Sequence, residues 1–358
     1  MWAVKPHVPL SVIVLIAAAV LAGCGGGEAR PPEAFAPSWS PDGRTIAYVV
    51  DPDPAEGCSY GSCVYRFELW VMRADGTGAK KLALGIIGGH PPTWSPDGRT
   101  IAFAHDTLED GGELYTVRKD GAHMRRLTRT PWVDDTPAAW SPDGKRLLFV
   151  HWPLESASTQ LYVTNADGSR QRRLTSLEPY EASWSPDGSR IAVTTFDGLF
   201  AVGADGRGQK MLFRVARSGM GGIGWSADSR QIAFGVEGGF AVVDVDGRVL
   251  ARPSERGYRW DWNYEMDASW SPDRTTLAYA RPEGGIDLIT ENGASWKRLT
   301  TTGAGPTWSP DGRRVAFTDD GDIVVVNADG TGRVNLTAVV ATDALEHPRS
   351  LGSSPPGP

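Results

Sequence analysis

A short motif, Trp-Ser-Pro-Asp-Gly, occurs five times in this 358-residue chain, and two degraded copies bring the number to seven. The fifth copy reads Trp-Ser-Ala-Asp-Ser, and the sixth ends in Arg274 instead of glycine. Successive copies start 38 to 55 residues apart, at Trp39, Trp94, Trp140, Trp184, Trp225, Trp270 and Trp308. Repeats of this length are typical of propeller blades, each of which buries its apolar faces against its neighbours. The motif therefore predicts an all-β fold, a seven-bladed β-propeller of four-stranded antiparallel blades.

The last repeat illustrates how one unit makes a blade. Residues 306–309 form a short extended run, and the Pro-Asp-Gly turn that follows leads into Val-Ala-Phe at 315–317. An apolar third strand follows at 323–326, and a tight Asp-Gly turn leads to the outer strand at 334–337. Four antiparallel strands joined by short turns make one blade, and the other copies keep this order.

The motif tryptophans have a structural interpretation. The residue before each of them is small: Ser38, Thr93, Ala139, Ser183, Gly224, Ser269 or Thr307. Small side chains suit innermost strands that crowd around an axis, so we expect the tryptophans to fill the space between neighbouring blades.

The repeat resembles that of TolB-type propellers, with Trp-Ser-Pro-Asp-Gly, Ile-Ala-Phe (101–103), an apolar third strand ending in Asp-Gly, and Arg-Leu-Thr (126–128). The resemblance covers about residues 37–337 and implies a binding scaffold. The periplasmic Tol-Pal component of this type has six blades and a preceding α/β domain, whereas seven repeats are counted here.

The same repeat resembles the propeller of prolyl-oligopeptidase-type enzymes, in which an α/β-hydrolase domain carries the catalytic triad. We assign no Gly-x-Ser-x-Gly nucleophile elbow to this chain, and roughly 20 residues follow the last predicted strand, too few for such a domain. We therefore expect that the chain is not an enzyme.

The N-terminus has the features of an export signal. Lys5 precedes an apolar stretch at residues 8–21, and Leu-Ala-Gly-Cys at 21–24 matches a bacterial lipobox. The match implies cleavage before Cys24 and lipid attachment to its sulfur; an ordinary signal peptide with an incidental cysteine is the alternative. We expect a signal peptide at 1–23, a flexible tether at 24–36, the propeller at 37–338 and a disordered tail at 339–358, in a lipid-anchored, extracytoplasmic protein of the bacterial cell envelope.

Charge and cysteine content limit the partners. The net charge of −7 and the lack of a basic stripe argue against a nucleic-acid partner. Cys58 and Cys63 lie in one insertion of an exported chain, so we expect a disulfide between them, with two free thiols as the alternative. A zinc site there would lack a second ligand pair.

The loops of a propeller sort onto two faces. We call the side with the second-to-third-strand loops and the between-blade loops the variable-loop face, because these loops differ in length. Binding usually resides in variable loops on a rigid scaffold. We predict a binding surface there, formed by Trp132, Asp134, Asp135, Trp152, Tyr180, Glu181, Trp260, Asp261 and Trp262. Aromatic faces beside carboxylates suit a sugar, a peptide or a cationic group, and self-packing of long loops is the alternative.

Metal and cofactor sites are not indicated. Asp135, Glu181 and Asp267 could ligate a cation at the channel mouth, but isolated rim carboxylates are more often solvated. We interpret His90, His105 and His151 as incidental, because they lack metal-motif spacing. We expect no cofactor and no metal.

Three functions remain open. The first is a monomeric, membrane-anchored, non-enzymatic scaffold that binds a protein, peptide or envelope glycan. The second is a propeller-type lyase or hydrolase that uses carboxylates at the channel mouth, which would require a perturbed acid–base pair in a pocket. The third is a structural spacer with a featureless variable-loop face.

Overall fold

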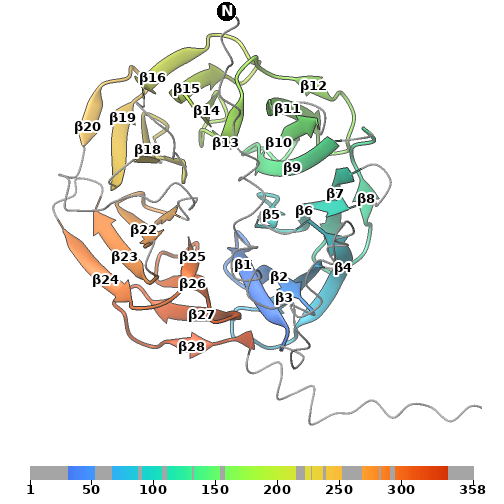
Figure 1. The fold of residues 1–358 in the computed structure, drawn as a ribbon, viewed down its shortest axis with the longest axis vertical. Helices are drawn as coiled ribbons and strands as arrows, with labels where there is room; N and C mark the ends of the chain where they lie inside the picture. The colour runs from blue at the N-terminus through green and yellow to red at the C-terminus, as the bar shows by residue number, and fades with distance from the viewer. Residues whose placement is uncertain are drawn as a thin grey trace, which may run out of the picture.

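The strands of the protein form a ring around a central axis (Figure 1). The computed structural model describes residues 31–52, 67–87, 91–106, 111–130, 133–153, 158–214, 222–226, 228–236, 239–251, 268–281, 284–290 and 295–337. Groups of strands follow one another around the ring from β1 to β28, and the first and last groups are in contact. Across these described ranges, no helix is both long and apolar enough to span a bilayer.

Sixteen of the described strands form four separate four-stranded antiparallel sheets, each paired in sequence order. This arrangement defines a propeller blade. The strands are β13 (Pro179–Trp184), β14 (Arg190–Thr195), β15 (Gly198–Gly203), β16 (Lys210–Arg214), β17 (Gly224–Trp225), β18 (Gln231–Val236), β19 (Gly239–Asp244), β20 (Val249–Ala251), β21 (Ala268–Trp270), β22 (Thr276–Ala280), β23 (Ile286–Thr290), β24 (Trp296–Thr300), β25 (Ala304–Trp308), β26 (Arg314–Asp319), β27 (Asp322–Asn327) and β28 (Val334–Asn335).

The other twelve described strands are hydrogen-bonded into one larger sheet. They are β1 (Glu33–Trp39), β2 (Thr45–Asp51), β3 (Phe67–Arg73), β4 (Lys80–Ile86), β5 (Thr93–Trp94), β6 (Thr100–Asp106), β7 (Gly111–Arg118), β8 (Arg125–Arg126), β9 (Val133–Trp140), β10 (Arg146–Pro153), β11 (Gln160–Asn165) and β12 (Arg172–Arg173). Antiparallel pairing runs through β1–β4, β5–β8 and β9–β12, and a β4–β6 bridge and parallel β7–β9 pairing link these groups. The all-β propeller of four-stranded antiparallel blades is confirmed.

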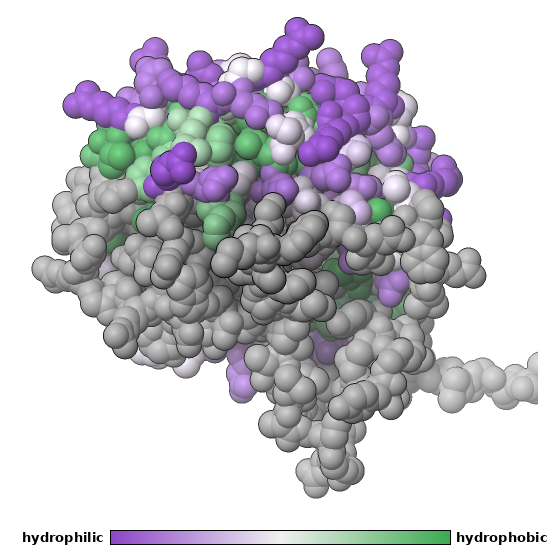
Figure 2. All heavy atoms as spheres, turned by 45° about the horizontal axis from the view of Figure 1, so that its top comes forward, coloured by the Kyte–Doolittle hydropathy of each residue, from purple (hydrophilic) through white to green (hydrophobic). Residues whose placement is uncertain are grey.

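The apolar core lies between neighbouring blades. Trp94 packs with Leu69 and Ala83 of the preceding blade, and Trp225 packs with Leu212 and Phe213 of its own preceding blade. On the surface seen in Figure 2, hydrophilic residues lie at the top of the view above a band of hydrophobic residues. The motif tryptophans thus fill the inter-blade space, where their large apolar area stabilises the contact.

The indole N–H groups add a directional link between blades. Trp94 Nε1 donates to the carbonyl of Ser38 at 3.1 Å, and Trp140 Nε1 donates to that of Thr93 at 3.1 Å. In each case the acceptor is the residue just before the motif tryptophan of the preceding blade. These partly buried hydrogen bonds help to fix the register of one blade on the next.

The motif turn is also held together locally. In the first copy, Ser40 Oγ donates to Asp42 Oδ1 at 2.6 Å, and the backbone N of Arg44 donates to the same oxygen at 3.1 Å. The serine–aspartate bond recurs at the same distance in all seven copies. These bonds lower the pKa of the aspartate, as at Asp42, where the serine hydrogen bond is the largest cause.

The last sheet meets the first strand through the same kinds of contact. Trp39 Nε1 donates to the carbonyl of Thr307 at 3.3 Å, and the backbone N of Ala34 donates to the carbonyl of Gly321 at 2.5 Å. The Arg314 guanidinium lies 4.9 Å from the centre of the Trp39 ring. β1 begins at Glu33 and so includes residues that precede the expected propeller start at residue 37.

Candidate functional site

Two neighbouring rungs of the β9–β10 ladder bring four polar or aromatic residues together. Asp134 lies opposite Trp152, and Asp135 lies opposite His151. β9 follows a between-blade loop and β10 precedes a second-to-third-strand loop, so both rungs lie at the variable-loop face. Three of these residues belong to the predicted binding surface, whereas His151 was interpreted as incidental.

Several predictions fall outside the described residues. These are the binding residues Trp132, Trp260, Asp261 and Trp262, the proposed cation ligand Asp267, His90, Cys24, and the Cys58–Cys63 pair. They remain predictions.

Asp134 joins two blades. The backbone N of Gly112 in β7 donates to Asp134 Oδ1 at 2.8 Å, where β7 and β9 pair in parallel. A Cβ on Gly111 would lie 2.4 Å from the carbonyl oxygen of Val133, and Gly111 has a φ of +91°. The close approach therefore requires glycine at that position. One carboxylate oxygen of Asp134 is thus engaged in holding the blade junction.

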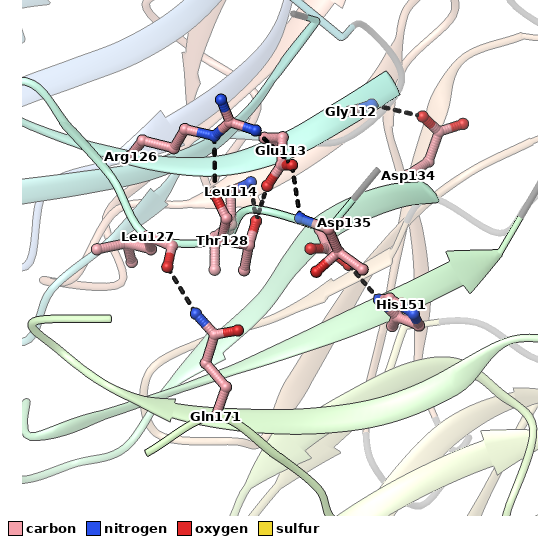
Figure 3. Close-up of polar contacts among 11 residues, drawn as sticks. Gly112, Glu113, Leu114, Arg126, Leu127, Thr128, Asp134, Asp135, His151 and Gln171 are labelled. Atoms are coloured by element: carbon pink, nitrogen blue, oxygen red, sulfur yellow. Dashed lines mark hydrogen bonds and ion pairs between the residues drawn. The ribbon is translucent and has the colours of Figure 1, made fainter. Parts of the chain in front are cut away.

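Asp135 and His151 form a buried pair (Figure 3). The Asp135 side chain is fully buried, and its Oδ1 lies 2.6 Å from His151 Nδ1. The His151 ring lies against Tyr162, with 4.8 Å between ring centres. Asp135 Oδ2 has no hydrogen-bond partner within the described part of the chain. Burial raises the pKa of Asp135, and the hydrogen bond from His151 acts in the opposite direction.

A second buried carboxylate, Glu113, lies beside this pair on β7 (Figure 3). It accepts hydrogen bonds from Arg126 Nη2 at 2.7 Å, from Thr128 Oγ1 at 2.5 Å and from the backbone N of Thr130 at 2.8 Å. Its negative charge also contributes to the raised pKa of Asp135.

The Glu113 arrangement recurs elsewhere in the ring. In the last sheet, Asp322 accepts hydrogen bonds from Asn335 at 2.6 Å and from Thr337 at 2.5 Å. In both blades, an acidic residue in the first few positions of the third strand thus accepts hydrogen bonds from the fourth strand and the residues that follow it. Glu113 thus has a structural role that recurs in another blade, whereas the Asp135–His151 pair is not part of that recurring arrangement.

The pair has a defined chemical capacity. A carboxylate that holds one nitrogen of an imidazole fixes the ring orientation and leaves the other nitrogen as the atom through which the ring could exchange a proton with a ligand. The interpretation of His151 as incidental missed this pairing, because the two residues meet only through the β9–β10 register. Among the described residues, no group of three His, Cys, Asp or Glu side chains could hold a metal ion.

The next blade presents exposed aromatic rings. Tyr180 lies at the bulge between Pro179 and Glu181 in β13 and is 48% exposed. Glu181 accepts a hydrogen bond from the backbone N of Ile223 at 3.3 Å, so it also links two blades. Phe196, in the short loop between β14 and β15, is 61% exposed and was missing from the predicted surface. Its signal in the sequence is a phenylalanine in a second-to-third-strand loop.

Three of the curated proteins that align with this chain cover only parts of it. The uncharacterized peptidase YuxL of Bacillus subtilis is 34% identical over 96 residues, 27% of this chain and 14% of that protein. The Tol-Pal system protein TolB of Anaeromyxobacter dehalogenans is 35% identical over 107 residues, 29% of this chain and 21% of that protein. Dipeptidyl-peptidase 5 of Porphyromonas endodontalis is 30% identical over 94 residues, 26% of this chain and 13% of that protein. The chain therefore spans 21% or less of the length of these relatives.

Solved structures share the fold at low identity. A puromycin-hydrolyzing peptidase of Mycobacterium tuberculosis matches with a TM-score of 0.65 and 16% identity, over 86% of this chain and 52% of that chain. An oligogalacturonate lyase in complex with manganese matches with a TM-score of 0.59 and 13% identity, over 81% of this chain and 87% of that chain.

The expectation that the chain is not an enzyme is wrong as stated. Two of the aligned relatives are named as peptidases, so the repeat occurs in enzymes and cannot exclude catalysis. The chain also contains one match to the nucleophile-elbow pattern, contrary to the assignment from the sequence. Residues 57–61 read Gly-Cys-Ser-Tyr-Gly and fit the Gly-x-Ser-x-Gly pattern, although they lie outside the described residues.

A family model provides the broadest match. The model described as the TolB beta propeller domain covers residues 31–257, more than half of the chain, and agrees with the four-stranded blades and the repeated motif. The chain belongs to the TolB β-propeller domain family.

Proposed function

We propose that this chain is an extracytoplasmic propeller that binds a peptide segment of a partner protein at its variable-loop face. The exposure of two aromatic rings on one blade, Tyr180 at 48% and Phe196 at 61%, carries the proposal. Trp152 of the preceding blade lies at the same face. Exposed aromatic side chains on a rigid scaffold are common anchors of peptide and protein recognition.

Hydrogen bonds join the blades beneath these rings to one another, which favours a binding surface that is already ordered before a ligand binds. Thr159 Oγ1 donates to the carbonyl of Pro179 at 2.8 Å, joining the β9–β12 blade to β13. Glu181 and Asp134 each accept a backbone N–H from a neighbouring blade. Binding to such a surface costs less conformational entropy, because few residues of the propeller have to become ordered when the ligand binds.

A peptide suits the aromatic surface better than the other ligands considered. Two aligned relatives are named as peptidases and one as a Tol-Pal system protein, so peptide and protein ligands are a natural extension to this chain. An envelope glycan could stack on the same rings and is the competing ligand. We propose that the chain acts as a monomer.

The proposal includes export and membrane anchoring. Its support is the lipobox at residues 21–24 and an aligned relative that is named as a Tol-Pal system protein. Residues 1–23 would be removed as a signal peptide. The lipid on Cys24 would hold the protein at the membrane, and residues 24–36 would link it to the propeller. Cys58 and Cys63 would form a disulfide. Residues 339–358 would be a disordered tail.

We also propose that the ring contains seven blades. The support is the seven motif copies and the contacts by which Trp39 and Ala34 join the first strand to the last sheet. The three groups β1–β4, β5–β8 and β9–β12 then count as three blades that share the larger sheet.

The binding surface can be tested with the full-length chain and an array of synthetic twelve-residue peptides. Tyr180→Ala with Phe196→Ala should weaken binding to the best array peptides at least about tenfold, because buried aromatic anchors cost about 2 kcal/mol or more on truncation. Both rings are exposed, so the melting temperature should hardly change. Trp296→Ala is the matched control, since Trp296 is 49% exposed but lies on the outer strand β24. Equal losses in the control and the double variant would count against a site at the variable-loop face.

The buried Asp135–His151 pair supports a second candidate, a propeller that carries out acid–base chemistry as a hydrolase or lyase. His151→Gln should lower turnover of a dipeptide p-nitroanilide at least about tenfold, the lower range for loss of a general acid or base. His105→Gln is the control, because His105 also lies 4.8 Å from a tyrosine ring, that of Tyr115, in the adjacent blade. Unchanged turnover in His151→Gln, or no turnover by the unmodified chain, would exclude this role.

A further inference from the structure

A groove of about 490 Å³ lies on the outer rim between two blades. One wall is the outer strand β8 with its flanking residues, and the other is the turn of the next blade. The residues that line it include Arg125, Arg126, Arg129, Asp167 and Ser169. The groove is built from an outer strand and a third-to-fourth-strand turn, and at Arg126 it adjoins Glu113, the buried carboxylate beside the Asp135–His151 pair.

Elsewhere on the rim, the basic residue that corresponds to Arg125 contacts the Asp-Gly turn of the next blade, as Arg125 itself does through its charge interaction with Asp167. Lys80 Nζ donates to the carbonyl of Asp120 at 2.5 Å, and Lys210 Nζ lies 3.3 Å from Asp246 Oδ1. Lys297 Nζ donates to the carbonyl of Asp329 in the same way. A single basic residue across an Asp-Gly turn is thus the ordinary arrangement between neighbouring blades.

The groove beside β8 departs from this arrangement by an excess of arginine. Segments 123–129 and 167–173 contain six arginines and one acidic residue, in a chain whose net charge is −7. The acidic residue, Asp167, accepts hydrogen bonds at Oδ1 from the backbone N and the hydroxyl of Ser169, at 2.9 and 2.6 Å. Asp167 and Glu113, whose Oε1 lies 2.7 Å from Arg126 Nη2, together offset two of these six positive charges.

Two of the arginines are fixed by the architecture. Arg126 Nε donates to the carbonyl of Thr128 at 2.9 Å, and Arg173 Nε donates to that of Thr175 at 2.8 Å. Arg125 and Arg129 are exposed and form no ion pair with any described residue. The charge of Arg125 interacts with Asp167 and helps to lower the pKa of that carboxyl, but both guanidinium groups remain exposed to solvent and so accessible to a ligand.

The turn opposite these arginines is held in place. Gln171 Nε2 donates to the carbonyl of Leu127 at 2.6 Å and to that of Gly168 at 3.1 Å, which ties the turn to the chain just after β8. A Cβ on Gly168 would lie 3.0 Å from the same Leu127 oxygen. Arg170 and Arg172 extend the positive charge onto the next blade and are also exposed. The two walls are thus fixed relative to each other while the free arginines project from them.

We propose that this groove binds the phosphate groups of a linear polyanion, with Arg125 and Arg129 as the principal contacts. Guanidinium groups match phosphate oxygens in a bidentate geometry, and positive charges spread over two blades suit a ligand with charge at every repeat. An acidic peptide is disfavoured because β8 and β12 are two residues long and offer little strand edge for main-chain pairing.

The proposal predicts salt-dependent binding of fluorescein-labelled polyphosphate by the full-length chain, measured by fluorescence anisotropy. Arg125→Gln with Arg129→Gln should raise Kd at least about tenfold and reduce the slope of log K against log salt by about 2, roughly one for each lost phosphate contact. The matched control is Arg99→Gln with Arg313→Gln, which removes two exposed arginines from the motif turns and should leave Kd within about twofold.

The competitors distinguish the sources of the anion. Excess unlabelled polyphosphate should displace the probe, whereas inorganic phosphate should do so only at much higher phosphate concentration, since it lacks linked charges. Poly-glutamate that displaces the probe as well as polyphosphate would overturn the assignment to phosphate. Equal weakening in the control pair would show diffuse electrostatics without a site and would also overturn it.

Discussion

At the residue scale, the Asp135–His151 pair is the feature that sequence reasoning could not supply. The pKa of Asp135 is raised above its usual 3.8 because the carboxyl group is buried, so folding makes its ionised form less favourable than in the unfolded chain. Its contribution to stability is therefore fully present below pH 3.8 and is lost as the pH rises through the raised value. We expect Asp135→Asn, which keeps an oxygen for His151 Nδ1, to match or exceed the wild-type stability at pH 7. This advantage should disappear toward pH 3.8 in thermal unfolding scans. His151→Leu, in contrast, should cost about 3–5 kcal/mol at pH 7 in denaturant titrations, since it leaves a buried carboxylate without its partner. An Asp135→Asn variant that is much less stable at pH 7 would show that the ionised pair is the favoured form.

At the element scale, the range of an interaction along the chain decides what the sequence could predict. The motif turn is held by the hydrogen bond between Ser40 and Asp42, which are two residues apart. Five consecutive residues therefore determine its conformation, and the turn in turn indicates a strand on either side. The apolar third strands and the Asp-Gly turns could be predicted for the same reason, because each depends on a few consecutive residues. The parallel pairing of β7 with β9 joins Gly112 to Asp134 across 22 residues. It has no signal in the repeat, because no other junction between described strands shows parallel pairing. The same distinction applies to the candidate binding surface, of which one part could be predicted from the sequence and another part could not. Aromatic residues outside the repeat could be found by comparing copies, but the use of Asp134 and Glu181 as blade-to-blade acceptors depends on geometry that only the folded ring provides.

At the scale of the whole molecule, the described strands of the proposed ring close it without exchange between its ends, since β1–β4 and β25–β28 each pair within one chain segment. At an interior junction the covalent chain holds the two blades together, whereas at the closure only contacts such as the bond from Trp39 Nε1 to Thr307 do so. We therefore expect Trp39→Phe and Trp94→Phe to cost similar free energies of unfolding, about 1–2 kcal/mol for the lost hydrogen bond and packing, but to differ in where the native state opens. Hydrogen exchange should increase in both β1 and β25–β27 for Trp39→Phe, since these elements separate together. In Trp94→Phe it should increase only near the substitution, because the adjoining chain keeps the blades in place. Increased exchange confined to the neighbourhood of residue 39 would mean that the ends of the ring are joined as firmly as its interior blades.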